Sequence, residues 1–263
     1  MLDTEVMNPK ANSETFRINP TWAGIIPKDQ WAVYLDAIRV TRKTGARFLL
    51  GGAFGLASYT GRWRNTKDLD FFVRATDKDR IVDALTKAGF DDYHPTLAYD
   101  RGWIYRAVRE DVLVDVIWRT PNRRSEVDEQ WFERSRRLVL NGEELAVLPA
   151  EELLAVKLYV LQRDRCDWPD LLNLLYTACD DMEWPHVLAR LGPEEPLLGG
   201  LLQVFNWLAP ERAKTIPPDI RKRFCLQEPS AADLAAALDY RVALLDSRPW
   251  FAGFQPMDKP MQL

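Results

Sequence analysis

Short apolar runs separated by glycine and polar turns mark the centre of the first half of the chain. The run at 48–50 (Phe-Leu-Leu) predicts a short buried strand, and Gly51-Gly52 follows at once, where a backbone turns tightly or approaches a ligand closely. Residues 53–58 predict a short helix, and a second apolar run at 68–73 predicts another strand. The pattern is therefore strand, glycine turn, helix, loop and strand.

Two further helices and two hairpins are predicted around this centre. Apolar residues at helical spacing indicate helices over about 27–45 and 76–89, and the second opens on a capping-box sequence at 76–79. Apolar segments flank residues 110–111 (Glu-Asp) and 141–142 (Asn-Gly), so each pair is predicted to form the turn of a hairpin.

The pattern in the second half of the chain is helical. A helix is predicted from Pro149, another is predicted to be capped by Asp167 and Asp170, and a long last helix is predicted from Ser230 to about Asp246. Between these, helical stretches are expected at 184–191, 196–209 and 217–226.

Together these elements predict an α+β fold, in which a short mixed β-sheet with flanking helices precedes a helical C-terminal part. The predicted divisions are an irregular N-terminal arm (1–22), a mixed α/β core (23–148), a helical C-terminal domain (149–247) and an irregular tail (248–263).

Composition narrows the class of protein. The 263 residues are 47% hydrophobic, which is enough to build a sizeable core, and the net charge of −4 argues against a surface that binds nucleic acid all over. Three cysteines without paired spacing support neither a disulfide framework nor a zinc site. The sequence shows no signal peptide and no apolar run of membrane length, so we expect a cytoplasmic protein without a membrane partner.

Two carboxylates open the second strand of the central stretch. Because side chains alternate along a strand, Asp68 and Asp70 are predicted to share one face. Neighbouring carboxylates repel, so beside an apolar strand they need a cation, and oxygen ligands suit a hard divalent ion such as Mg²⁺. The alternative is a solvated pair of aspartates at the entry of a strand.

The glycine turn adds a second chemical element. A turn that leads into a helix presents free backbone N–H groups, which bind phosphate. A phosphate site formed by Gly51 and Gly52 beside a Mg²⁺ pair at Asp68 and Asp70 is typical of phosphoryl or nucleotidyl transfer.

These motifs resemble a known superfamily. Gly51-Gly52 followed by Arg64-Asn65-Thr66-Lys67-Asp68-Leu69-Asp70 resembles the signature of the nucleotidyltransferases that include DNA polymerase beta. More narrowly, the Gly-Gly-x-Ala start and the Arg-x-Thr-x-Asp-x-Asp run look like those of small bacterial members, among them abortive-infection nucleotidyltransferase toxins of toxin–antitoxin pairs and aminoglycoside nucleotidyltransferases. The resemblance covers about residues 46–175. Many members have Gly-Ser where this chain has Gly51-Gly52, so here the phosphate contacts would come from backbone N–H groups alone.

The resemblance implies a third carboxylate on a later strand, and Asp115 within the apolar run 112–118 fits it. Its implied role is metal ligand or general base for the acceptor hydroxyl. A carboxylate in such a run is unusual, which supports a functional role. The alternative is that Asp115 faces water on a half-exposed strand.

Three further residues are candidates for binding the nucleotide. Arg64 and Thr66 precede the carboxylates and would contact phosphate, the alternatives being a solvated loop arginine and a turn threonine. Lys157 falls inside an apolar arc of the helix from Pro149, and together with Arg163 it resembles a family pattern in which the lysine reaches the triphosphate. The alternative for Lys157 is a buried salt bridge, to Asp70 or Asp170.

The implied function is transfer of a nucleoside monophosphate from a nucleoside triphosphate such as ATP to an acceptor hydroxyl, with release of pyrophosphate. Two Mg²⁺ ions would be held by Asp68, Asp70 and Asp115. A small molecule, the 3′ end of an RNA such as tRNA, and a protein hydroxyl all remain possible acceptors. Two alternatives are a non-catalytic module that binds a nucleotide or a partner, and Mg²⁺-dependent phosphoester hydrolysis.

Overall fold

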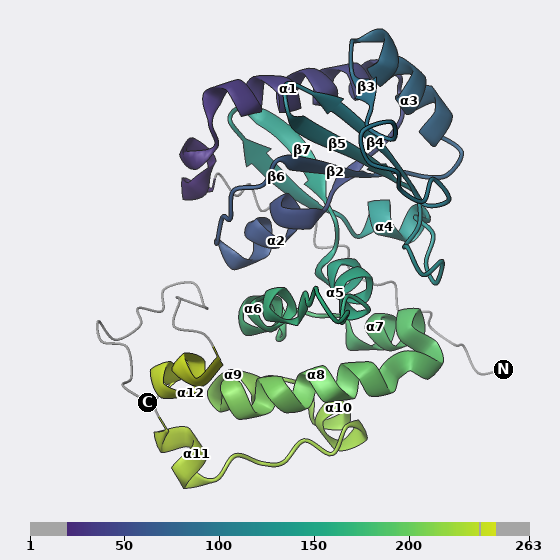
Figure 1. The fold of residues 1–263 in the computed structure, drawn as a ribbon. Helices are drawn as coiled ribbons and strands as arrows, with labels where there is room; N and C mark the ends of the chain where they lie inside the picture. The colour runs from purple at the N-terminus through teal and green to yellow at the C-terminus, as the bar shows by residue number, and fades with distance from the viewer. Residues whose placement is uncertain (1–19, 237, 246–263) are drawn as a thin grey trace, which may run out of the picture.

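The computed structural model describes residues 20–236 and 238–245. It is an α+β structure in three layers: helices, a mixed β-sheet and a larger group of helices (Figure 1). The predicted fold class is confirmed. Most of the predicted N-terminal arm and all of the predicted tail lie outside the described residues. None of the helices in the described ranges has the length and apolar character needed to cross a membrane.

The sheet has seven strands in the order β3-β4-β5-β2-β1-β7-β6. Their bounds are β1 Leu49–Leu50, β2 Asp68–Phe72, β3 Asp91–Asp92, β4 Ile104–Arg109, β5 Val112–Ile117, β6 Arg136–Leu140 and β7 Glu143–Val147. The pairs β2–β5 and β1–β7 are parallel, and the other neighbours are antiparallel. Both predicted hairpins are confirmed. Their turns use left-handed backbone at 110–111 and 141–142, with φ of +51°, +60°, +48° and +84°.

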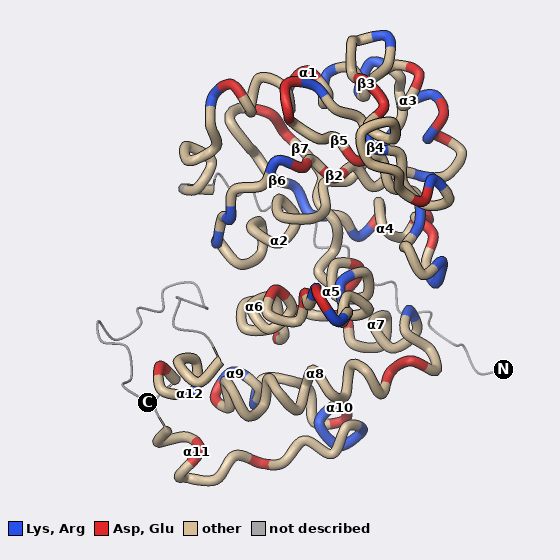
Figure 2. The backbone as a smooth tube through the Cα atoms, viewed as in Figure 1, with Lys and Arg blue, Asp and Glu red and all other residues tan. Residues whose placement is uncertain are grey.

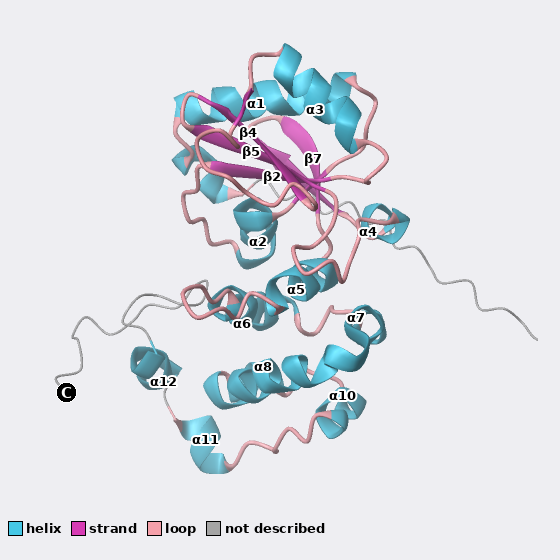
Figure 3. Ribbon diagram, turned by 45° about the vertical axis from the view of Figure 1, so that its right-hand side comes forward, coloured by secondary structure: helices cyan, strands magenta, loops and turns pink. Residues whose placement is uncertain are grey.

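One face of the sheet is covered by two helices of the first half of the chain (Figure 3). The helices of this half are a 3₁₀ turn at Thr21–Ile25, α1 Lys28–Lys43, α2 Gly52–Thr60, α3 Lys78–Lys87 and α4 Glu129–Glu133. α1 and α3 bury their apolar side chains with those of Leu69 and Phe71 from β2. The capping box predicted at 76–79 is wrong. Asp77 lies at the N-cap position of α3 without a capping hydrogen bond, because its carboxylate binds Arg74 and Arg80 instead.

The other face of the sheet meets α2 and the helical part of the chain (Figures 1 and 3). The helices of this part are α5 Ala150–Leu158, α6 Trp168–Ala178, α7 Trp184–Leu191, a 3₁₀ turn at Gly192–Glu194, α8 Glu195–Leu208, α9 Pro210–Ala213, α10 Pro218–Arg223, α11 Ala231–Ala235 and α12 Leu238–Leu245. A buried apolar cluster joins Phe72 and Ile117 of the sheet, through Leu148, to these helices. Asp68 and Asp70 share the face of Phe72, and Asp115 shares the face of Ile117.

Two of the predicted helices of this part end at a turn or divide. The helix from Pro149 ends at Leu158, and residues 160–167 form a turn in which the Asp167 N–H donates to the Val160 carbonyl over 2.8 Å. The predicted long last helix divides at Ala236, whose ψ of 127° is extended backbone. The capping box at Ser230 is confirmed, and it begins the first of the two short helices.

Candidate active site

Three charged side chains form a row across neighbouring strands. In the parallel pairing of β2 with β5, Asp70 lies opposite Asp115, and in the antiparallel pairing of β5 with β4, Asp115 lies opposite Arg106. Asp68 precedes Asp70 by two positions and therefore shares its face. The three predicted carboxylates are thus placed on two adjacent strands, on the sheet face that meets the helical part.

Arg106 holds both oxygens of Asp115. Its Nε donates to Asp115 Oδ1 over 2.8 Å, and its Nη2 donates to Oδ2 over 2.7 Å. Asp115 is only 2% exposed, so the alternative in which it faces water is wrong. The sequence interpretation missed Arg106, although the register that follows from the predicted turn at 110–111 places it opposite Asp115. A two-residue turn there pairs Arg109 with Val112, and three steps further along the ladder it pairs Arg106 with Asp115.

The glycine turn lies directly against Asp70. The Gly51 N–H donates to the Asp70 carbonyl over 3.1 Å, and α2 begins at Gly52. Gly52 has a φ of +50°, and a Cβ added there would lie 1.7 Å from Asp70 Oδ2. A side chain at position 52 would therefore meet a left-handed backbone and would require the Asp70 carboxylate to shift. The start of α2 and the Asp70 carboxylate form one compact unit.

The pKa values of Asp70 and Asp115 in this row indicate that the positive charge around them does not balance their negative charge. Burial, followed by repulsion from Asp115 and Asp68, raises the pKa of Asp70 to about 7, although Lys157 and Arg106 act in the opposite direction. Burial also raises the pKa of Asp115, and the guanidinium of Arg106 opposes this shift. Carboxylates with raised pKa values in one cluster are typical of a site that takes up a cation.

The raised pKa of Asp70 predicts a pH dependence of the free energy of unfolding. The unfolded chain releases this proton near pH 4 and the metal-free folded protein only near pH 7, so this carboxyl group favours folding at low pH and loses that effect as pH rises between these values. In EDTA, we expect the stability of the wild type relative to Asp70→Asn to fall between pH 5 and pH 8. Thermal unfolding of both proteins measures the difference. A constant difference across this range would contradict the raised pKa.

Lys157 is buried between two carboxylates. Its Nζ lies 2.7 Å from Asp167 Oδ2 and 2.7 Å from Asp170 Oδ2, and the residue is 9% exposed. Figure 2 shows acidic and basic positions close together where α5 and the start of α6 meet. The predicted cap at Asp167 and Asp170 is wrong, because the Asp167 side chain forms no capping hydrogen bond and both carboxylates bind Lys157. Because Lys157 also lowers the pKa of Asp70, its charge acts on the carboxylate row formed by Asp68, Asp70 and Asp115.

Replacing this lysine is expected to destabilise the fold. Lys157→Met leaves Asp170 without its cation and Asp167 with Arg165 alone, and we expect the free energy of unfolding at neutral pH to fall by about 3 kcal/mol. Chemical denaturation measures it. Adding Asp170→Asn to Lys157→Met should recover part of the loss, because it removes the carboxylate charge that lost its ion pair. Wild-type stability in the single variant would show that the ion pairs contribute nothing.

Thr66 and Arg64 lie on the loop between α2 and β2. Thr66 Oγ1 accepts the Asp68 N–H over 3.2 Å, and its carbonyl accepts the Tyr34 hydroxyl over 3.0 Å and the Gln30 amide. Thr66 therefore fixes the entry of β2, as the turn alternative predicts. Arg64 is exposed, and within the part of the chain that the structure describes it forms no ion pair.

Comparison with known proteins assigns the family. The family model described as "Uncharacterised nucleotidyltransferase" matches residues 50–209, which is more than half of the chain. The chain belongs to this nucleotidyltransferase family. The resemblance predicted from Gly51-Gly52 and the Asp68-Leu69-Asp70 run is thereby confirmed. No curated protein matches the sequence.

Several solved structures are similar to this nucleotidyltransferase at low sequence identity. The lincosamide antibiotic adenylyltransferase LnuA, bound to lincomycin, is 15% identical, with a TM-score of 0.41 over 57% of this chain and 96% of that chain. ANT(2")-Ia in complex with adenylyl-2"-tobramycin is 11% identical, with a TM-score of 0.37 over 74% and 99%. JHP933 from Helicobacter pylori is 13% identical, with a TM-score of 0.39 over 77% and 100%.

Asp68 and Asp70 fit the divalent ion that nucleotidyltransferase chemistry uses. Among the described residues, no group of three or more His, Cys, Asp or Glu side chains is arranged to hold a metal, which agrees with the position of Asp115 on Arg106. Mg²⁺ is commonly bound by one or two carboxylates together with substrate phosphates and water. Asp68 and Asp70, with oxygen donors only and a raised pKa at Asp70, meet that requirement without a third side chain.

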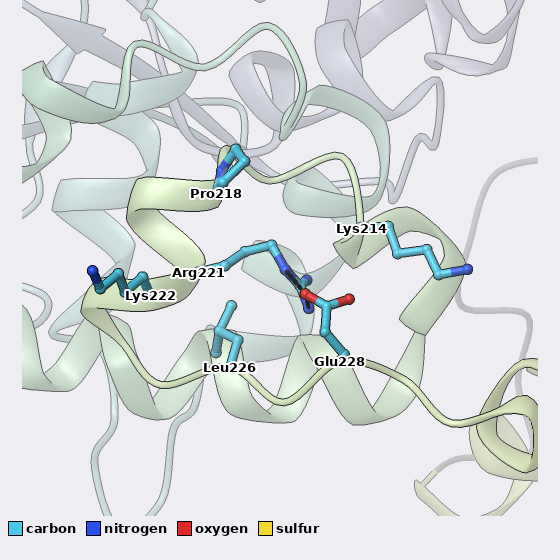
Figure 4. A pocket seen from close by; sticks show the side chains of 6 residues that line it. All are labelled: Lys214, Pro218, Arg221, Lys222, Leu226 and Glu228. Atoms are coloured by element: carbon cyan, nitrogen blue, oxygen red, sulfur yellow. Dashed lines mark hydrogen bonds and ion pairs between the residues drawn. The ribbon is translucent and has the colours of Figure 1, made fainter.

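A pocket of this nucleotidyltransferase lies elsewhere, around α9 and α10 (Figure 4). Lys214, Pro218, Arg221, Lys222, Leu226 and Glu228 line it. The Arg221 guanidinium is bound by its own chain, to the Ala213 and Gln227 carbonyls and to Glu228, and Lys214 and Lys222 point outward. The one buried cation of this pocket is therefore already paired within the fold.

Proposed function

We propose that this protein transfers a nucleoside monophosphate from a nucleoside triphosphate to an acceptor hydroxyl. The observation that carries the proposal is the placement of Asp70 beside Asp115 and against the first residue of α2. This arrangement puts carboxylates next to the N-terminus of a helix, so that a bound metal and a bound phosphate would be neighbours.

In the proposed reaction the acceptor oxygen forms a bond to the α-phosphorus. The bond from that phosphorus to the oxygen bridging to the β-phosphate breaks, pyrophosphate leaves, and the hydroxyl proton is released. Asp68 and Asp70 would hold the Mg²⁺ ions, and Asp115, whose two oxygens accept from Arg106, would complete the first site through a remaining lone pair. When bound, these ions would lower the pKa of the acceptor hydroxyl and neutralise charge on the leaving group.

The side chains and backbone around the carboxylates would position the nucleotide. The Gly52 N–H would bind phosphate at the start of α2, whereas the Gly51 N–H is already bonded to the Asp70 carbonyl, so Gly51 would contribute by placing the turn. Lys157 would neutralise charge on the triphosphate. Because its ammonium also binds Asp167 and Asp170, it would then have two roles. Arg64, exposed on the preceding loop, is available for an outer phosphate.

A label-transfer assay tests the proposal. The purified protein is incubated with Mg²⁺, each α-labelled nucleoside triphosphate in turn and a bacterial lysate, and RNA, protein and small molecules are then separated. We expect label in one of these fractions, which names the acceptor class, and no label when EDTA is added. Triphosphate that binds without transfer would favour the non-catalytic module, and release of free monophosphate would favour hydrolysis.

A further inference from the structure

The pocket beside α9 and α10 has the size of a small-molecule site. Its volume is about 300 Å³, and α8 lies between it and the layer formed by α5 and α6 (Figures 1 and 3). Pro218 and Leu226 give it an apolar wall, and Arg221 of α10, whose side chain is 7% exposed, gives it a buried cation. The pocket is therefore separate from the carboxylate row.

Backbone carbonyls hold the Arg221 guanidinium in place. Its Nη1 donates to the Ala213 carbonyl over 2.8 Å, and its Nη2 donates to the Gln227 carbonyl over 3.1 Å. The Gln227 carbonyl also accepts from the Asn206 side chain of α8 over 3.0 Å. These bonds fix the guanidinium without neutralising its charge, so the pocket is preorganised for an anion.

The other edge of this guanidinium has an incomplete partner. A single oxygen of Glu228, Oε1, lies 3.2 Å from both Nε and Nη2 of Arg221 (Figure 4). By contrast, Arg223 of the same helix binds both oxygens of Glu195, with 2.9 Å from Nε to Oε2 and 2.9 Å from Nη2 to Oε1. A guanidinium binds most strongly when two oxygens meet two nitrogens in parallel, and Glu228 does not supply that arrangement.

The charges around the pocket favour an anion that carries two charges. The Glu228 side chain is 80% exposed, so turning it from Arg221 into water costs little. Lys214 and Lys222 line the pocket and direct their ammonium groups outward (Figure 4). Within the described part of the chain Lys222 forms no ion pair, and Lys214 pairs with the exposed Glu211 over 3.4 Å. Once Glu228 turns away, the positive charge that remains attracts a dianion more strongly than a single carboxylate.

We propose that this pocket binds the phosphate group of a small phosphorylated molecule, which displaces Glu228 from Arg221. Two phosphate oxygens would accept from Nε and Nη2 of Arg221, where Glu228 supplies one oxygen. Lys214 and Lys222 would turn inward over the bound group, and the apolar wall would contact the rest of the molecule. Inorganic phosphate offers the same chemistry without using that wall. The site is independent of the proposed function, because none of its residues belongs to the carboxylate row.

Side-chain NMR tests the proposal at the residue concerned. Phenyl phosphate, inorganic phosphate and benzoate are titrated separately into the full chain, and the ¹H–¹⁵N signals of the arginine Nε groups are followed. Phenyl phosphate should shift the Arg221 signal in a saturable way and leave the Arg223 signal unchanged. Benzoate has the same ring with a singly charged carboxylate, so it should bind about tenfold more weakly. Tighter binding of phenyl phosphate than of inorganic phosphate would identify an organic phosphate as the ligand, and equal binding would identify free phosphate.

Four variants complete the test. Glu228→Gln should bind phenyl phosphate about tenfold more tightly, because it removes the competing negative charge. Glu195→Gln is the matched control, since it removes the carboxylate that pairs with Arg223 on the same helix, and it should leave the affinity unchanged. Lys222→Gln should weaken binding about threefold. Arg221→Lys loses the two-point contact and should weaken binding about tenfold or more. Thermal unfolding reports whether Arg221→Lys folds, and the exposed Glu228 and Lys222 variants test the proposal if it does not.

Three results would each overturn the proposal. The first is an Arg221 signal that phenyl phosphate does not move. The second is unchanged or weaker binding in Glu228→Gln, which a purely structural pair of Arg221 and Glu228 predicts. The third is benzoate that binds as tightly as phenyl phosphate, because the pocket would then recognise the ring or any anion.

Discussion

Asp70→Asn is expected to lower the rate of nucleotidyl transfer by about 10³-fold or more while the protein remains folded. Asp70 lies beside Asp115 and against Gly52, at the centre of the row that would hold the metal. A bound metal ion contributes several kcal/mol of charge stabilisation in the transition state, and each 1.4 kcal/mol corresponds to about tenfold in rate. Transfer rates measured at saturating Mg²⁺ give the size of the effect.

The folded state of this variant can be checked independently. Because burial, and then its carboxylate neighbours, raise the pKa of Asp70, the amide should make the metal-free protein at least as stable as the wild type at pH 8. Asp83→Asn on α3, where Asp83 pairs with Lys87 at the surface, serves as the control and should keep full activity. Substantial turnover by folded Asp70→Asn would remove this carboxylate from the proposed metal site.

Gly52→Ser is expected to reduce transfer by about 100-fold or more, although many members of the superfamily have serine at the corresponding place. The Cβ would lie 1.7 Å from Asp70 Oδ2, so the carboxylate or the start of α2 must move. A shift of about 1 Å at a catalytic group can reduce the rate by about 10²-fold. The left-handed backbone adds roughly 1–2 kcal/mol of instability.

Gly45→Ser is the matched control for this substitution. Gly45 has a φ of +72°, but a Cβ there has no neighbour within 4 Å, so it should show the same backbone cost without loss of transfer. Stability and transfer rate are measured for both variants. Equal transfer rates in Gly52→Ser and Gly45→Ser would show that Asp70 accommodates the side chain. A gain in nucleotide affinity in Gly52→Ser would show that a serine hydroxyl can bind phosphate here.

The sequence predicted the elements whose signals are local. The Asn141-Gly142 turn and the turn at 110–111 require left-handed backbone, and the residues present there adopt it. Gly51-Gly52 and the two aspartates of β2 were located because a glycine pair and an alternating strand have fixed consequences for backbone and side-chain direction. The structure places these residues together as the local pattern predicted.

The partners of the charged side chains were harder to predict, because they depend on contacts between elements. Asp167 and Asp170 have the spacing of a helix cap, yet a buried lysine ten positions before Asp167 binds both more strongly than backbone N–H groups would. Arg106 was missed because pairing it with Asp115 required extending the ladder from the predicted turn. The division at Ala236 has no clear local signal in the sequence.

The apolar cluster that runs through Leu148 has a consequence for how substrates enter. Phe72 and Ile117 of the sheet belong to the same buried cluster as the side chains of α5 and α6. A hinge motion that separated the two layers would expose this apolar surface to water, at about 25 cal/mol for each Å². The layers that flank the carboxylates should therefore move as a rigid unit. We therefore expect a nucleotide to reach the carboxylates by rearrangement of loops and side chains rather than by opening of the two layers.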